Sequence, residues 1–572
     1  LNILRINMKE GSIRQEMLPP KLMFYGNRGL IAKIMAEEVA PDCEPLGRYN
    51  KLIIANGPLA IASISCSGRV SAGAKSPLTG GIKEANSGGI MGYRLASLGI
   101  RALIIEDKPK QDVLFILHIG KKGAQLIDAS EYKMMRIHAL TKKLFQRFGP
   151  NCAISCIGPA GEMLMSAASV ANTDMDGNPS RFSARGGLGA VMGSKGLKAI
   201  VVEDYKKIKP PIRNEERYKK ALKQYVEEIR SAYQTSVGYT LYGTAGIIPT
   251  ISEIGAMPSY GFRQGSFENA DKISGERLRE TILERGGEGN ATHACMPGCL
   301  VRCSNIFPDQ DGKQVVASLE YETLSMCGSN LGLTSLDDIA ELNYLCNDYG
   351  LDTIEIGTTI GVYMDLGLAE FGDAEIAKKL VREIGTGTLL GKILGEGAAI
   401  TARIFKSQRA PVVKGQSIAA HEPRALKGMS IIYATSPMGA DHTAGVTTRV
   451  RLDQLDPYIW LEYARDLQVK IAAFDTLGLC MFITTAGPKI PDLVVEMLNG
   501  IYGTDHGPDF IASLGKDVIW TEKEFNAKAG LSAAHDKMPE FMLEEPFPPH
   551  NAVSDIPKQH YQKFWEPSYW RP

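Results

Sequence analysis

The chain has 572 residues, and at about 150 residues per domain this length predicts two to four domains. Lys plus Arg equals Asp plus Glu at 64 each, so no excess positive charge exists to hold a nucleic acid or an acidic membrane. No apolar run reaches the roughly 18 residues of a spanning helix, so we expect no membrane span.

The N-terminal third alternates short β-branched runs with glycine-rich turns, a pattern typical of strands. Leu1–Arg5 reads as a strand rather than a signal peptide, and because the chain begins without Met we expect a few residues to precede it. Further predicted strands are Leu52–Ala55, Ala102–Glu106, Val113–His118, Ala153–Ile157 and Ala199–Glu203.

From about Asn214 the pattern changes to apolar residues at three- and four-residue spacing, which predicts helices. The expected helices are Glu215–Ala232, Ala270–Arg285, Leu336–Tyr349 and Ile354–Leu366. Proline-rich joints near Pro210 and Pro411 indicate domain boundaries, giving domains 1–208, 209–410 and 411–572. We expect the proline-rich tail after Met538 to be extended, and we find no internal repeat.

Three of the ten cysteines are clustered: Cys295, Cys299 and Cys303 are spaced C-x3-C-x3-C around a Pro-Gly turn. Clustered thiols in a neutral chain without an export signal indicate metal more often than disulfides. A four-thiolate cage needs one more ligand, and Cys480 is the best candidate. A structural zinc site and three cysteines merely packed in a core remain alternatives, while the radical S-adenosylmethionine spacing differs by one residue.

Short strings along most of the chain resemble the aldehyde ferredoxin oxidoreductase family. Each string is weak alone, but their order and span make the resemblance specific. They are Leu52–Leu59, Ser67–Arg69, Lys75–Gly80, Ala85–Gly89, Ile157–Glu162, Arg185–Lys195, Glu320–Thr323, Gly350–Thr353 and Asp475–Cys480.

The resemblance implies an α+β fold, in which an N-terminal β-rich domain cradles a bis-pyranopterin cofactor and two mostly helical domains follow. It also implies one tungsten, or molybdenum, atom held by the two pterin dithiolenes and a nearby [4Fe–4S] cluster. Carried over by position, the cluster ligands are Cys295, Cys299, Cys303 and Cys480. A common family form has two residues between the first two cysteines, whereas this chain has three.

Two copies of a D-x-x-G-L motif resemble the segments that grip the two pterins. The C-terminal copy is intact at Asp475, Gly478 and Leu479. In the other copy Asn347 replaces the aspartate, which loses one charge-assisted contact to a pterin while its carbonyl can still accept a hydrogen bond. The residues expected at this second pterin are Asn347, Gly350, Leu351, Asp352 and Thr353.

The glycine-rich strings suit the pterin phosphates, because loop N–H groups bind phosphate where no Cβ intrudes. By position, the resemblance implies cofactor contacts from Asn86, Gly88, Arg181 and Gly186, with Mg²⁺ between the pterin phosphates. Arg69 is expected between cluster and pterin, where a guanidinium can offset negative charge.

Glu322 and His442 resemble the family's acid–base residues. A histidine can donate to a carbonyl oxygen, and a carboxylate can take a proton from the attacking water. Glu320 is the competitor of Glu322, and His421 is a lower-ranked pocket candidate.

The reaction implied is interconversion of an aldehyde and its carboxylic acid, with electrons leaving to ferredoxin or an electron-transfer subunit. A benzoyl-coenzyme A reductase-like ring reductase and a non-catalytic electron-transfer or scaffold subunit are the alternatives. Some relatives bridge two subunits with a metal bound by E-x-x-H, but here the segment Glu341–Tyr344 lacks the histidine. We therefore expect no bridging iron, with a homodimer formed by packing alone if one forms. The oxygen-labile cluster and missing export signal predict an anaerobic, cytoplasmic protein.

Overall fold

A computed structural model describes residues 1–571, and its N-terminal part consists of two six-stranded sheets. The first sheet has the order β2-β1-β6-β3-β4-β5 and the second the order β11-β10-β9-β12-β7-β8. The strands are β1 (Asn2–Asn7), β2 (Ser12–Met17), β3 (Leu52–Asn56), β4 (Val70–Lys75), β5 (Ile82–Ser87), β6 (Ile100–Glu106), β7 (Phe115–Gly120), β8 (Gly123–Asp128), β9 (Ala153–Cys156), β10 (Val170–Asn172), β11 (Arg181–Ser183) and β12 (Leu197–Val202).

The two sheets repeat one topology. Read from its other edge, the second sheet runs β8-β7-β12-β9-β10-β11, and in each sheet one parallel pair (β1 with β6, β7 with β12) lies among antiparallel neighbours. The expectation of no internal repeat is therefore wrong for the fold. Fully buried strands need only to be apolar, so the two copies can share their strand order with little common sequence.

Helices fill the space between and around the sheets. Apolar side chains of α2 (Met91–Ser97) and α5 (Leu188–Ser194) form one core with both sheets. The outer face of the second sheet packs on α3 (Ile137–Phe148), and α1 (Asn27–Glu38) packs on the first sheet. A one-turn helix, α4 (Pro159–Glu162), follows β9.

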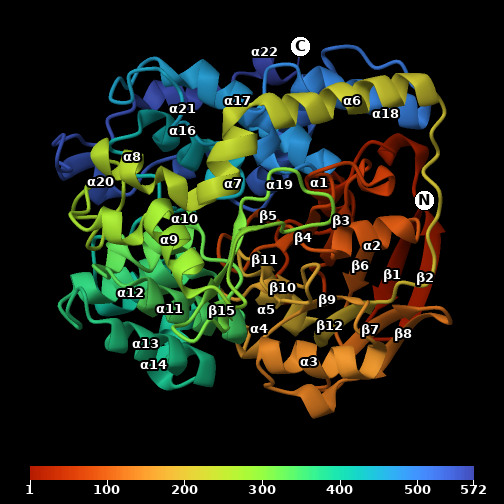
Figure 1. Cartoon of the computed structure of the whole chain (residues 1–572), viewed down its shortest axis with the longest axis horizontal. Helices are drawn as coiled ribbons and strands as arrows, with labels where there is room; N and C mark the ends of the chain where they lie inside the picture. Colours follow the sequence, from red (N-terminus) through yellow and green to blue (C-terminus); the bar gives the residue numbers. More distant parts are fainter. Residues whose placement is uncertain (572) are drawn as a thin grey trace.

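The rest of the chain is mostly helical, and Figure 1 shows the C-terminal helices along the top and α9 to α14 opposite the sheets. Early and late segments interleave, because α6 packs along α18. The elements are α6 (Glu215–Ser231), α7 (Tyr239–Tyr242), α8 (Ile248–Glu253), α9 (Gly275–Arg285), β13 (Asn290–His293), β14 (Ser304–Pro308), β15 (Gln314–Val316), α10 (Tyr321–Met326), α11 (Leu336–Tyr349), α12 (Thr353–Asp365), α13 (Ala374–Thr386), α14 (Leu389–Gly395), α15 (Ala398–Phe405), β16 (Val412–Val413), β17 (Gln416–Ser417), α16 (Lys427–Thr435), α17 (Trp460–Leu477), α18 (Ile490–Tyr502), α19 (Phe510–Lys528), α20 (Glu540–Glu544), α21 (Lys558–Phe564) and α22 (Pro567–Trp570).

The predicted α+β class, with N-terminal sheets followed by helices, is confirmed. The predicted helix Ala270–Arg285 is interrupted at Ser274, whose side chain accepts the Arg277 N–H and caps α9. The extended tail is wrong, since α20, α21 and α22 lie in it. Pro539, Pro557 and Pro567 stand at the starts of these helices, where the missing N–H has no intrahelical partner to lose. The boundaries at 208 and 410 remain predictions.

Candidate functional site

A cavity of about 560 Å³ lies where the sheets meet the helices. Its wall draws on β5, β11, α10, α11 and α17, so segments far apart in the sequence converge there. The predicted site residues that line it are Arg69, Asn86, Gly88, Arg181, Cys295, Cys303, Glu322, Asn347, Leu351, Thr353, His442, Asp475 and Cys480. Those that lie outside its lining are Gly186, Cys299, Gly350, Asp352, Gly478 and Leu479.

One end of the cavity, the cysteine end, is formed by Cys295, Cys303 and Cys480, and Cys299 adjoins it. A hydrogen bond with the Cys299 thiol, and then burial, raises the pKa of Cys295. Burial raises the pKa of Cys303, and the Glu320 charge adds to that rise. Grouped buried thiols remain neutral until positive charge is supplied, which bound iron would do.

The cysteines are spread too widely for one zinc ion. In a tetrahedral zinc–thiolate site with Zn–S of about 2.3 Å, the sulfurs lie about 3.8 Å apart. Within residues 1–571, the sole group of three or more metal-ligating side chains whose ligand atoms lie within 4.8 Å of one another is Asp174, Asp176 and His293. The four cysteine sulfurs therefore suit a larger cluster better.

Arg69 connects the cysteine end to the middle of the cavity. Its guanidinium donates to the Asn86 carbonyl at 3.0 Å, and its backbone N–H donates to the Gly478 carbonyl at 3.3 Å. Burial alone would lower the pKa of Arg69, but the charges that Cys480, Cys295 and Asp475 carry when ionised raise it. The guanidinium therefore stays a cation beside the cysteine end of the cavity.

The two G-L segments are equivalent helix ends. Gly350 (φ 79°) ends α11 and Gly478 (φ 77°) ends α17, both in the left-handed conformation that favours glycine. The next residue folds back identically, with Leu351 N–H donating to Cys346 O at 2.8 Å and Leu479 N–H to Phe474 O at 2.9 Å. The backbone motif is therefore the same at both ends.

Each helix end also docks on an equivalent turn of its own sheet. An added Cβ on Gly57, after β3, would lie 2.1 Å from the Leu477 carbonyl oxygen. An added Cβ on Gly158, after β9, would lie 2.3 Å from the Tyr349 carbonyl oxygen. The duplicated sheets thus present two matching helix ends to one cavity.

The polar residues at the two ends differ. Asp475 accepts from Arg28 and from Asn86, each at 3.3 Å, and burial followed by the Glu84 charge raises its pKa. Asn347, at the corresponding position, lines the cavity without a side-chain hydrogen bond among residues 1–571.

Asp348 and Asp352 have structural partners. Asp348 accepts the His138 N–H at 2.9 Å at the start of α3. Asp352 caps α12 by accepting the Ile354 N–H at 3.0 Å, and its other oxygen lies 3.5 Å from Arg185 Nε. Neither carboxylate belongs to the cavity lining.

At the other end, the carboxylate end, Glu322 on α10 lies between two histidines. Its Oε1 is 3.4 Å from His421 Nε2 and 3.5 Å from His442 Nε2, while Oε2 accepts the Ala420 N–H at 2.8 Å. Burial lowers the pKa of His421 to about 4, although the Glu322 charge opposes this. His421 is therefore neutral near pH 7, and it lies directly beside Glu322, although sequence reasoning ranked it lower.

Glu320 has a different setting. It also lines the cavity, but its carboxylate accepts from Thr244 Oγ1 at 2.6 Å and from Ser318, and it faces Cys303. The geometry thus brings Glu322, rather than Glu320, to His442.

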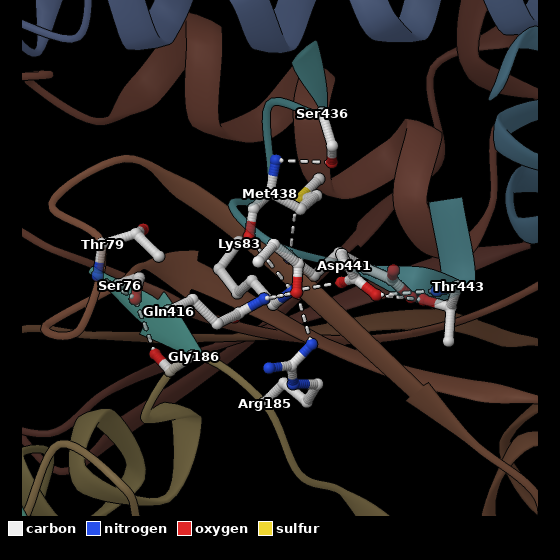
Figure 2. Close-up of polar contacts among 12 residues, drawn as sticks. Ser76, Thr79, Lys83, Arg185, Gly186, Gln416, Ser436, Met438, Asp441 and Thr443 are labelled. Atoms are coloured by element: carbon white, nitrogen blue, oxygen red, sulfur yellow. Dashed lines mark hydrogen bonds and ion pairs between the residues drawn. The ribbon is translucent and has the colours of Figure 1, made fainter. Parts of the chain in front are cut away.

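A buried ion pair holds Asp441, the residue that precedes His442 in the chain (Figure 2). Lys83 Nζ lies 2.5 Å from Asp441 Oδ2, and Thr443 donates its N–H and hydroxyl to Oδ1 at 2.9 and 2.7 Å. Arg185 donates to the Ala440 carbonyl at 2.5 Å. Burial alone would raise the pKa of Asp441, but the charges of Lys83 and Arg185 hold this pKa well below its usual range.

Gly186 belongs to this supporting layer. Its carbonyl accepts from Ser76 Oγ at 2.7 Å, and an added Cβ would lie 2.4 Å from Lys83 Cγ. In the structure it therefore permits close packing against Lys83.

The cavity wall carries buried polar atoms that have no hydrogen-bond partner among residues 1–571. They are Arg181 Nε, Ser304 Oγ, Glu322 Oε1, His421 Nδ1, His442 Nδ1 and Thr448 Oγ1. Gly88 brings backbone beside the cysteines, since an added Cβ would lie 3.0 Å from Cys295 Sγ. Because unsatisfied polar groups are costly when buried, the wall fits a large polar group such as a pterin.

Sequence reasoning missed several residues near the site. Cys66 contacts Cys299, although it directly precedes the recognised Ser67–Arg69 string. Arg449 and Lys470 line the cavity as exposed cations, and neither has an ion-pair partner within the described chain. No local pattern in the sequence marks Arg449 or Lys470.

No helix within residues 1–571 has the length and apolar character needed to cross a membrane.

Comparison with known proteins covers nearly the whole chain. Residues 3–204 match the family model described as the aldehyde ferredoxin oxidoreductase N-terminal domain, and residues 220–571 match that for domains 2 and 3. The tungsten-containing aldehyde ferredoxin oxidoreductase of Pyrococcus horikoshii is 32% identical over 96% of this chain and 92% of its own. That of Thermococcus kodakarensis is 33% identical over 95% and 91%.

More distant similarity extends to other activities. The aliphatic sulfonate oxidoreductase, WOR-like subunit, of Pyrococcus furiosus is 26% identical over 91% of this chain and 84% of its own. The solved active-site complex BamBC of benzoyl coenzyme A reductase, bound to 1,5-dienoyl-CoA, superposes with a TM-score of 0.81 over 100% of this chain and 93% of that chain. Its sequence identity is 18%, so this likeness concerns the fold alone.

Proposed function

Since the chain belongs to the aldehyde ferredoxin oxidoreductase family and is an oxidoreductase, we propose that it interconverts aldehydes and carboxylic acids at a tungsten, or molybdenum, bis-pyranopterin. Electrons would leave through a [4Fe–4S] cluster to ferredoxin or a partner subunit. One observation carries the proposal: a single cavity joins three cysteines at one end, with Cys299 adjoining them, to Glu322 between two histidines at the other.

The residues that would hold the cofactors follow from the cavity wall. Cys295, Cys299, Cys303 and Cys480 would ligate the cluster, and the helix ends at Asp475 and Asn347 would each accept hydrogen bonds from one pterin. Arg69 would offset negative charge between them. When bound, the metal–pterin group would supply a two-electron acceptor and the cluster a one-electron carrier.

The chain itself manages the protons. His442 would donate through Nε2 to the carbonyl oxygen and make its carbon more electrophilic, while Glu322 takes a proton from the attacking water. Neutral His421 would donate to Glu322 Oε1 without adding charge. An aldehyde and water then yield the carboxylic acid, two protons and two electrons.

Metal analysis tests the proposal first. Anaerobically purified protein should contain one tungsten or molybdenum and about four irons per chain, and it should reduce ferredoxin or a viologen dye when an aldehyde is added. Zinc, or iron without either heavy metal, would contradict the catalytic proposal and favour a scaffold or electron carrier.

Arg449 and Lys470 favour ring reduction of a coenzyme A thioester as the second candidate. Two unpaired cations at the cavity suit the phosphates of coenzyme A, which a simple aldehyde lacks. Reduced protein incubated with benzoyl-coenzyme A distinguishes the two, since formation of a dienoyl product without aldehyde oxidation would establish this reaction instead.

A further inference from the structure

A fifth cysteine lies against the four proposed cluster ligands. Cys66 Sγ is 3.8 Å from Cys299 Sγ, and the Cys66 side chain is fully buried. Cys66 and Cys299 both lie outside the cavity lining, whereas Cys295, Cys303 and Cys480 line it. Within residues 1–571, Cys299 is the one proposed ligand whose sulfur hydrogen-bonds with Cys66.

The backbone holds Cys66 in this place through both cysteine segments. The Cys66 carbonyl accepts the Cys480 N–H at 2.8 Å, and the preceding Ser65 Oγ accepts the Leu300 N–H at 3.1 Å. Tyr225 donates its hydroxyl to the Ser65 carbonyl at 2.9 Å. The short segment that carries Cys66 is thus tied at once to the C-x3-C-x3-C loop and to Cys480.

Cys66 also has a left-handed backbone, with φ of 65°. This conformation costs a residue with a Cβ about 1 kcal/mol or more, and glycine is the residue that adopts it freely. The sequence nevertheless has a thiol here, directed at Cys299.

We propose that the Cys66 thiol donates an S–H···S hydrogen bond to the Cys299 sulfur and thereby raises the reduction potential of the cluster. The inference rests on the proposed cluster. A cysteine that ligates iron is a thiolate and cannot donate, so in this pair Cys66 must be the donor. Hydrogen bonds to cluster sulfurs stabilise the reduced state, which carries more negative charge.

The test is a redox titration of the anaerobic holoprotein followed by the electron paramagnetic resonance signal of the reduced cluster. In Cys66→Ala the iron content should stay unchanged while the midpoint potential falls. We expect up to about a tenfold change in the oxidised-to-reduced ratio at a fixed potential, which is about 59 mV for one electron. Cys66→Ser retains a donor of similar size and should lie closer to the unmodified protein.

Cys156→Ala is the matched control, because Cys156 is an equally buried thiol that packs in the core of the second sheet. Its midpoint should not move. An unchanged midpoint in Cys66→Ala would overturn the proposal, and loss of iron would overturn it by making Cys66 a ligand. Protein without any cluster would overturn both this inference and the proposed function, whereas protein with a cluster but without aldehyde oxidation would contradict the function alone.

Discussion

The two ends of the cavity are prepared for charge in different ways. At the cysteine end, burial and neighbouring groups raise the pKa values of the thiols, so they would ionise only with the further positive charge of bound iron. At the carboxylate end, Asp441 already has its countercharge within the chain, because Lys83 lies 2.5 Å from it.

Because the two ends differ in this way, mutations can separate their functions. At the cysteine end, the thiols would need the charge of a bound metal group in order to ionise. At the carboxylate end, the side chains are already positioned by contacts within the protein. Variants at the carboxylate end should therefore change turnover or stability with the metals retained. Variants at the cysteine end and its pterin contacts should change metal content or potential.

The largest effect is expected from Glu322→Gln. Loss of a positioned proton acceptor typically costs about 10²- to 10⁴-fold in rate, so aldehyde-dependent dye reduction should fall by that factor with iron and tungsten content unchanged. Glu320→Gln is the matched control, since Glu320 faces Cys303 and hydrogen-bonds Thr244. A larger loss in the Glu320 variant would reverse the assignment, and a loss of metal in Glu322→Gln would undo the separation of the two ends.

Breaking the Lys83–Asp441 ion pair tests how far contacts within the protein position the carboxylate end before any cofactor binds. Lys83→Met leaves the buried Asp441 carboxylate without its main partner, and removing one member of such a pair typically costs about 3–5 kcal/mol of unfolding free energy. The double variant Lys83→Met/Asp441→Asn removes both charges and should recover most of that loss in denaturant unfolding. Equal stability of Lys83→Met and the parent protein would show that Asp441 is not dependent on the pair.

Sequence reasoning succeeded for the fold where local pattern decides the structure. The strand β3 was recognisable because five consecutive residues are buried, and α11 was recognised with its boundaries. The duplicated sheet was missed because the corresponding strands of its two copies need only be apolar, and many different apolar sequences meet that requirement. The helices of the tail were missed because proline was weighed as a helix breaker, although at a helix start it is tolerated.

At the site, the sequence identified residues that lie within short family motifs. It did not identify contacts between residues that are far apart in the chain. Asp475 and Cys480 were identified within one string, and the structure brings both to the cavity. Lys83 and Asp441 are separated by 358 positions, and Cys66 and Cys299 by 233. Such pairs are created by tertiary packing, so one sequence gives no signal for them. The assigned roles of the site residues remain predictions.

His421 gives the carboxylate end a pH dependence in the acid range. Its pKa is about 4 in the folded protein and about 6.5 unfolded, so below pH 6.5 the unfolded chain binds a proton that the folded chain does not. Stability is therefore full above pH 6.5 and falls as the pH drops toward 4, by about 2 kcal/mol at pH 5 from this residue. In His421→Gln, the loss of unfolding free energy between pH 7 and pH 5 should shrink by that amount. An identical loss in both proteins would place a protonated His421 in the folded state.

An effect of similar size is expected at the two helix ends, whose backbone motifs are the same but whose polar residues, Asp475 and Asn347, differ. Asp475→Asn converts the α17 end to the polar character that Asn347 gives the α11 end, and it removes one charge-assisted contact worth about 1.5–3 kcal/mol. Tungsten or molybdenum retained after dilution and gel filtration should then fall about ten- to a hundredfold in affinity. The reciprocal variant Asn347→Asp should retain metal at least as well as the parent. If Asp475→Asn also retains it fully, the α17 end contributes no more charge to pterin binding than the α11 end does, and the asymmetry between the two motifs has no role in holding the cofactor.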